Sequence, residues 1–334
     1  MFWVRLSVPV ALLVTITVGR VFLTPDLVFV VLLIVFVTYG SGLEFLKRFS
    51  PFVALLVSYD ALRGLVPHVS KHVHYTEMVT FDRWLGLGEL PTAWLQRSLH
   101  AGTLHWYDAV FFGIYLMHFV TPVLAGVLVW RLREPGYWRY MWSFVVVSYA
   151  AFLTFLVFPA APPWMAARDH VIPAIQPVSD QLWTSLSMHS VPNLYARFAP
   201  NQVAAVPSLH SAYPLLVALF IGRLFGRRWG AVAMLYPASV WFGVVYLGEH
   251  YVFDVIAGAL YAIGAFLLVN RVMDARDARL ARRSPPTGAA GPTPSGDHGI
   301  PIDQGTVAGP LVLTDRAAGA ERAPSGSAAA TSSV

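Results

Sequence analysis

The sequence predicts an all-α fold, a polytopic bundle of about eight transmembrane helices, and two observations lead to it. Of the 334 residues, 56% are hydrophobic and only 12% are charged, whereas a soluble domain carries about 25% charged residues. The apolar residues also fall into blocks of roughly 15–25, which is the length that crosses a bilayer. Because each backbone polar group in lipid must be satisfied within its own segment, the blocks are expected to be helices.

The predicted spans cover, in chain order, residues 4–23, 27–46, 51–67, 106–130, 137–158, 207–225, 229–247 and 250–272. The first follows Arg5 and so resembles a signal peptide. No clear small-residue cleavage site precedes Thr24-Pro25-Asp26, which favours a retained helix. Pro207 and Ser208 open the sixth span, because proline suits a first helical turn and serine caps free N–H groups.

Basic residues between the spans predict the orientation. They follow the second span, separate the fourth from the fifth and the sixth from the seventh, and follow the eighth. They are Lys47 and Arg48; Arg131, Arg133 and Arg139; Arg223, Arg227 and Arg228; and Arg271, Arg276, Arg279, Arg282 and Arg283. Two predicted spans separate each of these segments from the next, so all four lie on the same side of the membrane. The positive-inside rule makes that side cytoplasmic. Both termini are then cytoplasmic, and the longer segments 68–105 and 159–206 face outward from the cell membrane.

The chain divides into a membrane-embedded catalytic domain over residues 1–273, with a core at about 50–272, and a cytoplasmic tail over 274–334. From about Ser284 the tail consists of Pro, Gly, Ala, Ser and Thr, a composition typical of disorder. The absence of cysteine excludes disulfides and thiolate chemistry. The net charge of +5 is spread between the apolar blocks, so it indicates topology and not a nucleic-acid surface.

Two motifs carry candidate chemistry. The first is Val206-Pro207-Ser208-Leu209-His210-Ser211, which places His210 beside a helix N-terminus, a ready site for anions. A capped helix with an interfacial histidine is the alternative explanation.

The second motif is Gly248-Glu249-His250-Tyr251, followed by Asp254 a turn inside the eighth span. His250 and Asp254 share a helical face at i,i+4. A carboxylate bonded to one ring nitrogen leaves the other free as a nucleophile or base. A structural His–Asp pair joining helices is the alternative. Both motif histidines begin outside-to-inside helices, so His210 and His250 are expected at the same depth near the outer face.

Together these residues resemble the type-2 phosphatidic acid phosphatase superfamily, over roughly residues 50–270. The form of the two histidine motifs, with Phe158-Pro159-Ala160-Ala161-Pro162-Pro163-Trp164 upstream, is similar to the inositol phosphorylceramide synthase (aureobasidin-resistance) branch. The resemblance implies a six-helix catalytic core. It also implies that His250 attacks phosphorus, Asp254 orients it, His210 protonates the leaving oxygen and Ser208 holds phosphate oxygens.

The chain departs from the superfamily pattern in its arginines. The Lys-x6-Arg-Pro motif is absent, and Val244 stands where an arginine precedes the attacking histidine by six residues. Phosphoryl transfer needs cations on the equatorial oxygens, so Arg63, Arg168 and Arg197 are the candidate substrate-binding replacements. Arg63 lies at i,i+3 from Asp60, and a self-neutralising Asp–Arg pair is the alternative for it.

The remaining histidines point less clearly to a function. His68, His72 and His74 lack an evident fourth ligand, so an interfacial polar stretch is favoured over a metal site. No metal or cofactor is predicted. His118 either lines the pocket or makes a helix contact.

The expected function is a phosphotransferase or phosphatase that acts on membrane lipids at the outer leaflet through a phosphohistidine. The partners would be a phospholipid donor and a hydroxyl acceptor. The motif details favour transfer of a phosphoinositol-like head group over hydrolysis of a phosphomonoester. A transporter or scaffold is the competing class, supported by Asp60, Asp108 and Asp254 within or beside the spans. An enzyme requires the two imidazoles within roughly 4–8 Å across a phosphate-sized gap.

The orientation can be tested by cysteine labelling, since the native chain has no cysteine to give a background signal. A cysteine at position 202, replacing Gln202, should react with an impermeant reagent in intact cells. One replacing Gly226 should react only after permeabilisation. The reverse pattern would put the histidine motifs on the cytoplasmic side.

Overall fold

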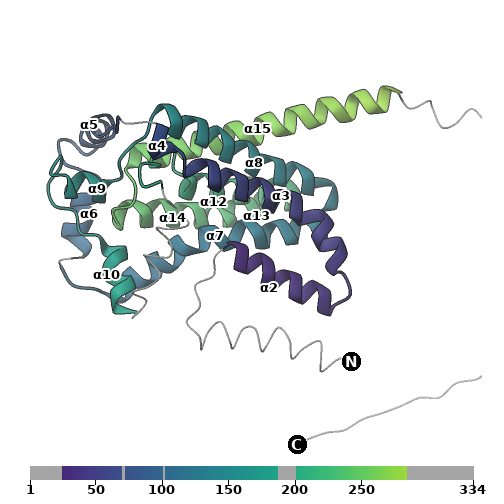
Figure 1. Cartoon of the computed structure of the whole chain (residues 1–334), viewed down its shortest axis with the longest axis horizontal. Helices are drawn as coiled ribbons and strands as arrows, with labels where there is room; N and C mark the ends of the chain where they lie inside the picture. Colours follow the sequence, from purple (N-terminus) through teal and green to yellow (C-terminus); the bar gives the residue numbers. More distant parts are fainter. Residues whose placement is uncertain (1–24, 70–71, 101, 187–200, 284–334) are drawn as a thin grey trace, which may run out of the picture. The chain divides into compact units, whose positions relative to one another are not determined.

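The computed structural model describes residues 25–69, 72–100, 102–186 and 201–283, and their regular secondary structure is helical throughout (Figure 1). The all-α prediction is therefore confirmed. Strand-like pairing in these ranges is limited to isolated bridges.

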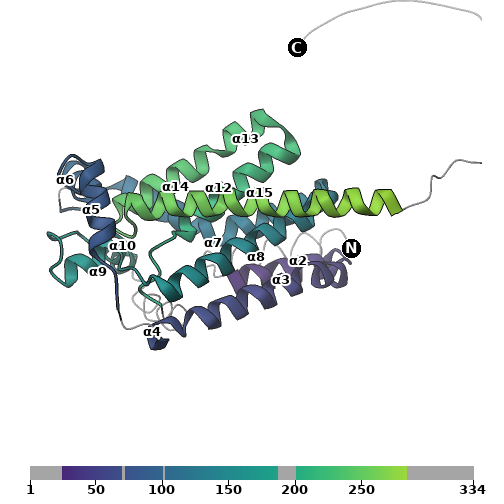
Figure 2. The same ribbon diagram turned by 90° about the horizontal axis from the view of Figure 1, so that it is seen from above.

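Long helices run side by side along the long axis in both ribbon views (Figures 1 and 2). They are α2 (Pro25–Thr38), α3 (Gly42–Arg63), α7 (Trp106–Leu132), α8 (Glu134–Val157), α12 (Leu209–Phe225), α13 (Arg227–Ala233) with α14 (Leu235–Tyr246), and α15 (Val252–Arg283). Shorter helices gather at one end: α4 (Val66–Val69), α5 (Thr76–Leu85), α6 (Pro91–Leu99), α9 (Pro163–Arg168) and α10 (Val178–Ser185).

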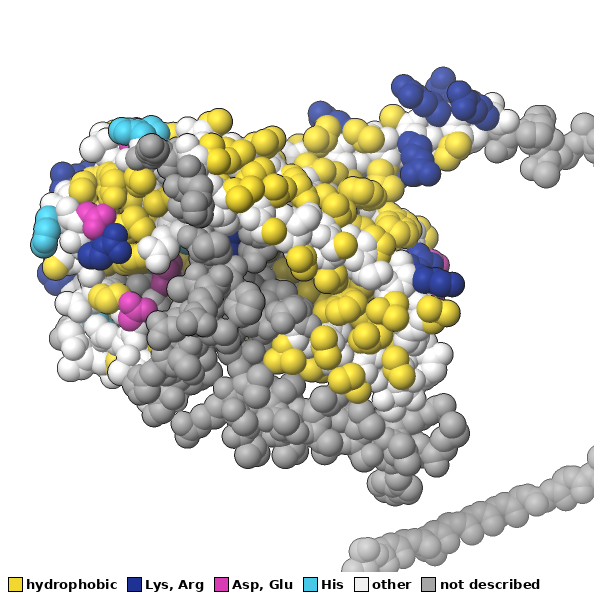
Figure 3. All heavy atoms as spheres, viewed as in Figure 1, with side chains coloured by type: hydrophobic (Ala, Val, Ile, Leu, Met, Phe, Trp, Pro, Cys, Tyr) yellow, Lys and Arg dark blue, Asp and Glu magenta, His cyan; other side chains and the backbone are white. Residues whose placement is uncertain are grey.

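By length and apolarity, α8, the α13–α14 segment and α15 can each cross a membrane. α7 is a fourth such segment if its two parts, which are bent by 52° near residue 119, count as one span. Large hydrophobic side chains are exposed along the long helices, as the yellow surface in Figure 3 shows. The chain is an integral membrane protein, as composition predicts.

The predicted spans from the second onward coincide with helices, although several boundaries differ. The second span ends at Thr38 rather than at 46, because Gly40, with φ of +80°, makes a turn and α3 already begins at Gly42. Lys47 and Arg48 therefore lie inside α3, with Pro51 accommodated within the same helix. The predicted first span lies outside the described residues.

The predicted start of the tail at residue 274 is wrong, because α15 continues as a helix to Arg283. Asp274 and Asp277 on this extension accept hydrogen bonds from Arg139, each at 2.6 Å. The segment 284–334 lies outside the described residues.

The four basic segments meet at one end of the bundle. Arg48 pairs with Glu134 at the start of α8, and the Arg133 guanidinium donates to the Leu224 carbonyl at 3.1 Å. With the Arg139 bonds to α15, these contacts connect all four segments. The prediction that they share one side of the bundle is consistent with this arrangement.

The hydrophobic core lies between α3, α7, α8, α12 and α15. Aromatic side chains fill its basic end, where Phe45 and Phe49 stack on each other at 4.7 Å and Trp130 meets Phe49 edge-on. α12 is central, in contact with α7, α8, α14 and α15.

At the other end, three loop segments are joined by backbone hydrogen bonds. Ala160 donates to the Val203 carbonyl at 2.8 Å and accepts from Ala205, while Ala161 donates to the His74 carbonyl at 3.0 Å. The stretch that leads into Pro207 and Ser208 is thereby tied to the loops before α5 and α9.

Asp82 on α5 caps the start of α15 from outside that helix. Its carboxylate accepts from the backbone N–H groups of Val252 and Phe253, at 2.9 and 3.0 Å. The first N–H groups of a helix have no partner within it, so this fully buried carboxylate replaces a local cap. Burial raises the pKa of Asp82 to about 6, the negative charge of Asp254 adds to the rise, and the two backbone bonds oppose it.

Asp82→Ala should lower stability by about 1 kcal/mol, as loss of a helix cap does. The folded protein keeps the Asp82 proton up to about pH 6, while the unfolded chain loses it near the ordinary value of 3.8. Asp82 therefore stabilises the fold more at low pH. The loss of stability in the variant, relative to the native chain, should be larger near pH 5 than near pH 8. Thermal unfolding in detergent measures both.

Thr80→Ala, an exposed change on the same helix, should leave the melting temperature unchanged. A deficit for Asp82→Ala that grows with rising pH would contradict the assignment.

Candidate active site

His210 sits in the first turn of α12, held by a local cap. The Ser208 hydroxyl accepts from the Ser211 N–H at 3.2 Å, and Ser208 has the extended backbone of an N-cap residue. The Ser208 N–H donates to the Asp254 carbonyl at 3.1 Å, and Ser211 Oγ donates to the Val255 carbonyl at 2.7 Å. These bonds attach the start of α12 to the start of α15.

Gly258 makes this close approach possible. A Cβ at this position would lie 2.1 Å from the Ser208 carbonyl oxygen, so any side chain would push the two helices apart.

His250 is presented by the turn between α14 and α15. The N–H groups of Glu249 and His250 both donate to the Val244 carbonyl, at 3.0 and 3.1 Å, and Gly248 takes φ of +82°. A Cβ on Gly248 would meet Ile175 at 2.9 Å, so glycine is required here both for its backbone angle and for space.

Asp254 contacts the His250 ring. The carboxylate is fully buried, and its Oδ2 lies 3.2 Å from His250 Nδ1 while accepting from the Tyr251 N–H at 3.0 Å. Because an ionised carboxylate only accepts, the hydrogen of a neutral His250 lies on Nδ1. The Nε2 lone pair is then the free one.

The two motif histidines are in direct contact, with His210 Nδ1 only 2.9 Å from His250 Nε2. Since His250 Nε2 accepts, His210 Nδ1 is the donor. His210, His250 and Asp254 therefore form one cluster, and the two rings lie within the expected range of roughly 4–8 Å, but no phosphate-sized gap separates them. The ring centroids are 5.1 Å apart, yet the facing nitrogens are already hydrogen-bonded, so a phosphate must separate them.

Tyr115 and His118 on α7 complete the surroundings of His210. The Tyr115 ring stacks on His210 with centroids 4.8 Å apart, and the His118 ring is 3.9 Å away. His118 Nδ1 lies 2.6 Å from the Tyr115 carbonyl within α7, and its ring contact with His210 on α12 places it beside the candidate site. The i,i+3 spacing of two polar rings within an apolar span was the available signal, but it does not reveal contact with α12.

Two buried acceptor sites stay open in this cluster. Among the described residues, neither His210 Nε2 nor Asp254 Oδ1 has a hydrogen-bond partner. A buried polar atom without a partner is costly, and its persistence is typical of a site that binds a ligand.

The candidate arginines lie in different surroundings. Arg63 is half-buried near the end of α3 and interacts electrostatically with both His210 and His118. Arg168 is exposed, pairs with Asp169 at 2.9 Å and lies over the Trp164 ring. Arg197 and the Asp60 side chain lie outside the described residues.

The Pro-Pro segment supports the His250 turn. The backbone N–H of Trp164 donates to the Gly248 carbonyl at 3.2 Å. The Ser179 hydroxyl on α10 donates to the Glu249 carboxylate. Burial raises the pKa of Glu249, while the Ser179 bond opposes the rise.

Gln96 on α6 holds the same turn from the other side. Its amide nitrogen donates to the carbonyls of Tyr246 and Gln176, at 2.9 and 3.0 Å, and its oxygen accepts from the Gln176 N–H at 2.8 Å. The role of Gln96 cannot be predicted from the sequence, because a glutamine in an amphipathic helix has no pattern that indicates such bonds.

Comparison with known proteins places these residues in a family. The model of the PAP2 superfamily matches residues 76–268, more than half of the chain and the whole span from α5 to most of α15. The chain belongs to the PAP2 superfamily. The predicted superfamily resemblance is thereby confirmed.

Curated relatives point to one branch of the PAP2 superfamily. A phosphoinositol dihydroceramide synthase of Bacteroides thetaiotaomicron is 29% identical over 234 residues, covering 65% of this chain and 74% of the relative. An inositol phosphorylceramide synthase of Candida albicans is 27% identical over 167 residues, covering 45% of this chain and 33% of the relative. The inositol phosphorylceramide synthase catalytic subunit aur1 of Schizosaccharomyces pombe is 27% identical over 171 residues, covering 47% and 38%.

The chain thus spans about a third of the length of the fungal relatives and most of the bacterial one. No solved structure matches it. All three relatives are synthases by name, so the prediction of an enzyme of the lipid phosphotransferase type is confirmed over the transporter or scaffold.

The electrostatic interaction of Arg63 with His210 and His118 predicts a role for this arginine in phosphate binding. Arg63→Gln should raise the KM for a phospholipid donor by about tenfold, as loss of a charge-assisted hydrogen bond does. Arg168→Gln, which removes an exposed guanidinium already paired with Asp169, is the matched control and should change KM little. Equal effects of the two substitutions would remove Arg63 from the site.

Proposed function

We propose that this PAP2-superfamily protein transfers a phosphoinositol-like head group from a phospholipid donor to a hydroxyl acceptor, through a phosphohistidine on His250. The observation that supports this most is the chain of contacts from Asp254 through His250 to His210. The names of the relatives support the head group and the lipid nature of the acceptor.

In the first step, Nε2 of His250 attacks phosphorus. A P–N bond forms as the P–O bond to the lipid alkoxide breaks. The Asp254 carboxylate stabilises the positive charge that develops on the imidazole, as triad carboxylates do. Nδ1–H stays on His250, so the ring keeps its orientation throughout.

His210 supplies the proton to the departing alkoxide. An anionic phosphate beside it stabilises the imidazolium form, and His210 Nδ1 already points to where the phosphorus of the His250 adduct would sit. In the second step, His210 takes the proton of the acceptor hydroxyl as that oxygen attacks phosphorus and the P–N bond breaks. Water in place of the alcohol would give hydrolysis.

The start of α12 holds the phosphate oxygens in this proposal. The first N–H groups of a helix lack partners within it and attract anions. The Ser208 hydroxyl accepts from Ser211 and can still donate its own proton. Arg63, which interacts electrostatically with His210, supplies positive charge that Val244 cannot.

The short helices and joined loops at the histidine end, opposite the basic segments, favour an active site at the extracytoplasmic face of the cell membrane. With the basic end in the cytoplasm, both chain termini are cytoplasmic. The donor then comes from the outer leaflet.

The proposed reaction is tested with purified protein and inositol-labelled phosphatidylinositol, with and without a long-chain alcohol acceptor such as a ceramide. A labelled product that appears only with acceptor supports transfer. Release of water-soluble inositol phosphate without acceptor would identify a phosphatase-like hydrolase. No product in either arm would contradict the proposed phosphoinositol transfer.

Substitution of the three central residues should separate their roles. His250→Ala should abolish turnover and the acid-labile phosphoenzyme. His210→Ala should lower kcat by about 10²–10⁴-fold, the range of general acid–base catalysis, and least for donors with good leaving groups. Asp254→Asn should lower kcat while sparing donor binding.

His72→Ala, an exposed histidine outside the cluster, is the control and should keep full activity. Phosphoenzyme that persists in His250→Ala would move the nucleophile elsewhere.

A further inference from the structure

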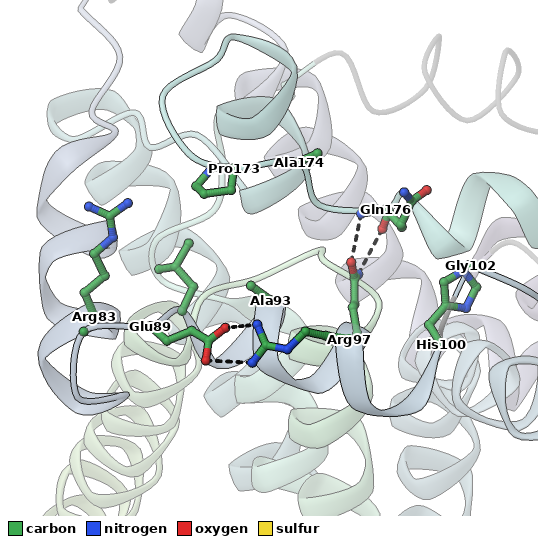
Figure 4. Close-up of a pocket in the computed structure, with 12 residues that line it drawn as sticks. Arg83, Glu89, Ala93, Arg97, His100, Gly102, Pro173, Ala174 and Gln176 are labelled. Carbon is green, nitrogen blue, oxygen red and sulfur yellow. Dashed lines mark hydrogen bonds and ion pairs between the residues drawn. The ribbon is translucent and has the colours of Figure 1, made fainter.

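A pocket opens at the same end of the bundle, apart from the histidines. It lies between α5, α6 and the segment 173–176, and its volume is about 530 Å³ (Figure 4). Neither His210, His250 nor Asp254 lines it. A volume of this size is typical of small-molecule sites.

Charged side chains line this pocket unevenly. Glu89 and Arg97 form a two-fold ion pair along one side, with Nη2 to Oε2 at 2.9 Å, as the dashed lines in Figure 4 show. Arg83 lies at one end of the pocket, and its guanidinium has no hydrogen bond or ion pair to any residue that the structure describes. The charged side chains that line the pocket thus leave one positive charge without compensation.

His100 adds an unsatisfied polar group. Its side chain is 1% exposed, and neither ring nitrogen has a hydrogen-bond partner among the described residues. The nearest charge is Asp108 Oδ2, 3.5 Å from Nδ1. A hydroxyl that reached His100 could bond to it in either direction, since a neutral imidazole both donates and accepts.

Membrane-seeking side chains are next in the chain to residues that line the pocket. Trp84 on α5, Leu87 in the following turn and Trp94 on α6 are exposed by 72%, 97% and 53%. Tryptophan is enriched at the boundary between lipid and water. In a chain that spans the membrane, these exposed side chains favour a position for α5, α6 and the pocket between them in the layer of lipid head groups.

We infer that this pocket binds the phosphate-bearing, hydroxyl-rich head group of a membrane lipid, as a second site separate from the histidines. Arg83 binds the phosphate. The Glu89 carboxylate, the Gln176 side chain and His100 bond to the hydroxyls. A choline head group lacks these hydroxyls and leaves His100 unsatisfied.

The wall of this pocket is also the support of the His250 turn. Gln96 lines the pocket and donates to the Tyr246 carbonyl, four residues before His250. Gln176, which also lines the pocket, is bound to Gln96 by two further hydrogen bonds. A bound head group therefore stabilises the turn that presents the nucleophile, a consequence that rests on the proposed function.

Lipid counting tests the site without turnover. His250→Ala protein in detergent is titrated with phosphatidylinositol, and the bound lipids are counted by native mass spectrometry. Two lipids are expected, one at the histidines and one in the pocket. Adding Arg83→Gln should remove one of them, with at least about tenfold weaker binding. An unchanged count would overturn the inference.

Arg227→Gln is the matched control, because it removes the same charge from an exposed position on α13 at the opposite end. Loss of a lipid in this control as well would show general attraction to charge and would overturn the pocket. If the histidines bind no donor, the parent holds one lipid and Arg83→Gln holds none, so failure of the proposed function gives a different count.

Two further arms identify what the pocket recognises. Soluble glycerophosphoinositol should displace the Arg83-dependent lipid, and phosphatidylcholine should not replace it. A lipid that persists against the soluble head group would be held by its acyl chains, which would contradict head-group recognition.

Discussion

The contact between the first turns of α12 and α15 is the constraint on which the candidate site depends. Ser208 and Ser211 donate to the backbone of Asp254 and Val255, and Gly258 leaves room for the Ser208 carbonyl. His210 and His250 each lie within a few residues of these contacts in the chain. The separation of the two imidazoles is therefore set mainly by the backbone. The surrounding helices act on the chemistry through this junction: Asp82 caps α15, and Gln96 and Trp164 hold the turn before it.

Much of this arrangement could be predicted from local pattern. The apolar blocks indicate the helices, and the i,i+4 spacing of His250 and Asp254 predicts their bond. The direction of successive spans predicts that His210 and His250 lie at one depth. These inferences succeed because each depends on a few neighbouring residues or on the alternation of spans across the membrane.

The rest depends on contacts between distant segments. Tyr115 and His118 contact His210 from α7, and Asp82 reaches α15 across 170 residues of chain. A single aspartate in an amphipathic helix carries no sign of its remote partner. The missing gap between the histidines is a similar case, since spacing predicts which residues meet but not whether they touch. The turn at Gly40 was obscured by Lys47 and Pro51, which look like a span boundary but lie within α3.

The hydrogen bond between His210 and His250 means that the nucleophile is covered at rest. Any phosphate that reaches Nε2 of His250 has to displace the N–H donor of His210. The hydrogen bond that is lost contributes on the order of 1 kcal/mol. Inorganic phosphate and small esters bring little additional binding energy to offset that loss. A lipid brings the burial of its acyl chains, and remote binding energy of this kind can be used to rearrange reacting groups. The covered lone pair thus favours substrates anchored in the bilayer and shields the histidine from stray electrophiles in the water beside it.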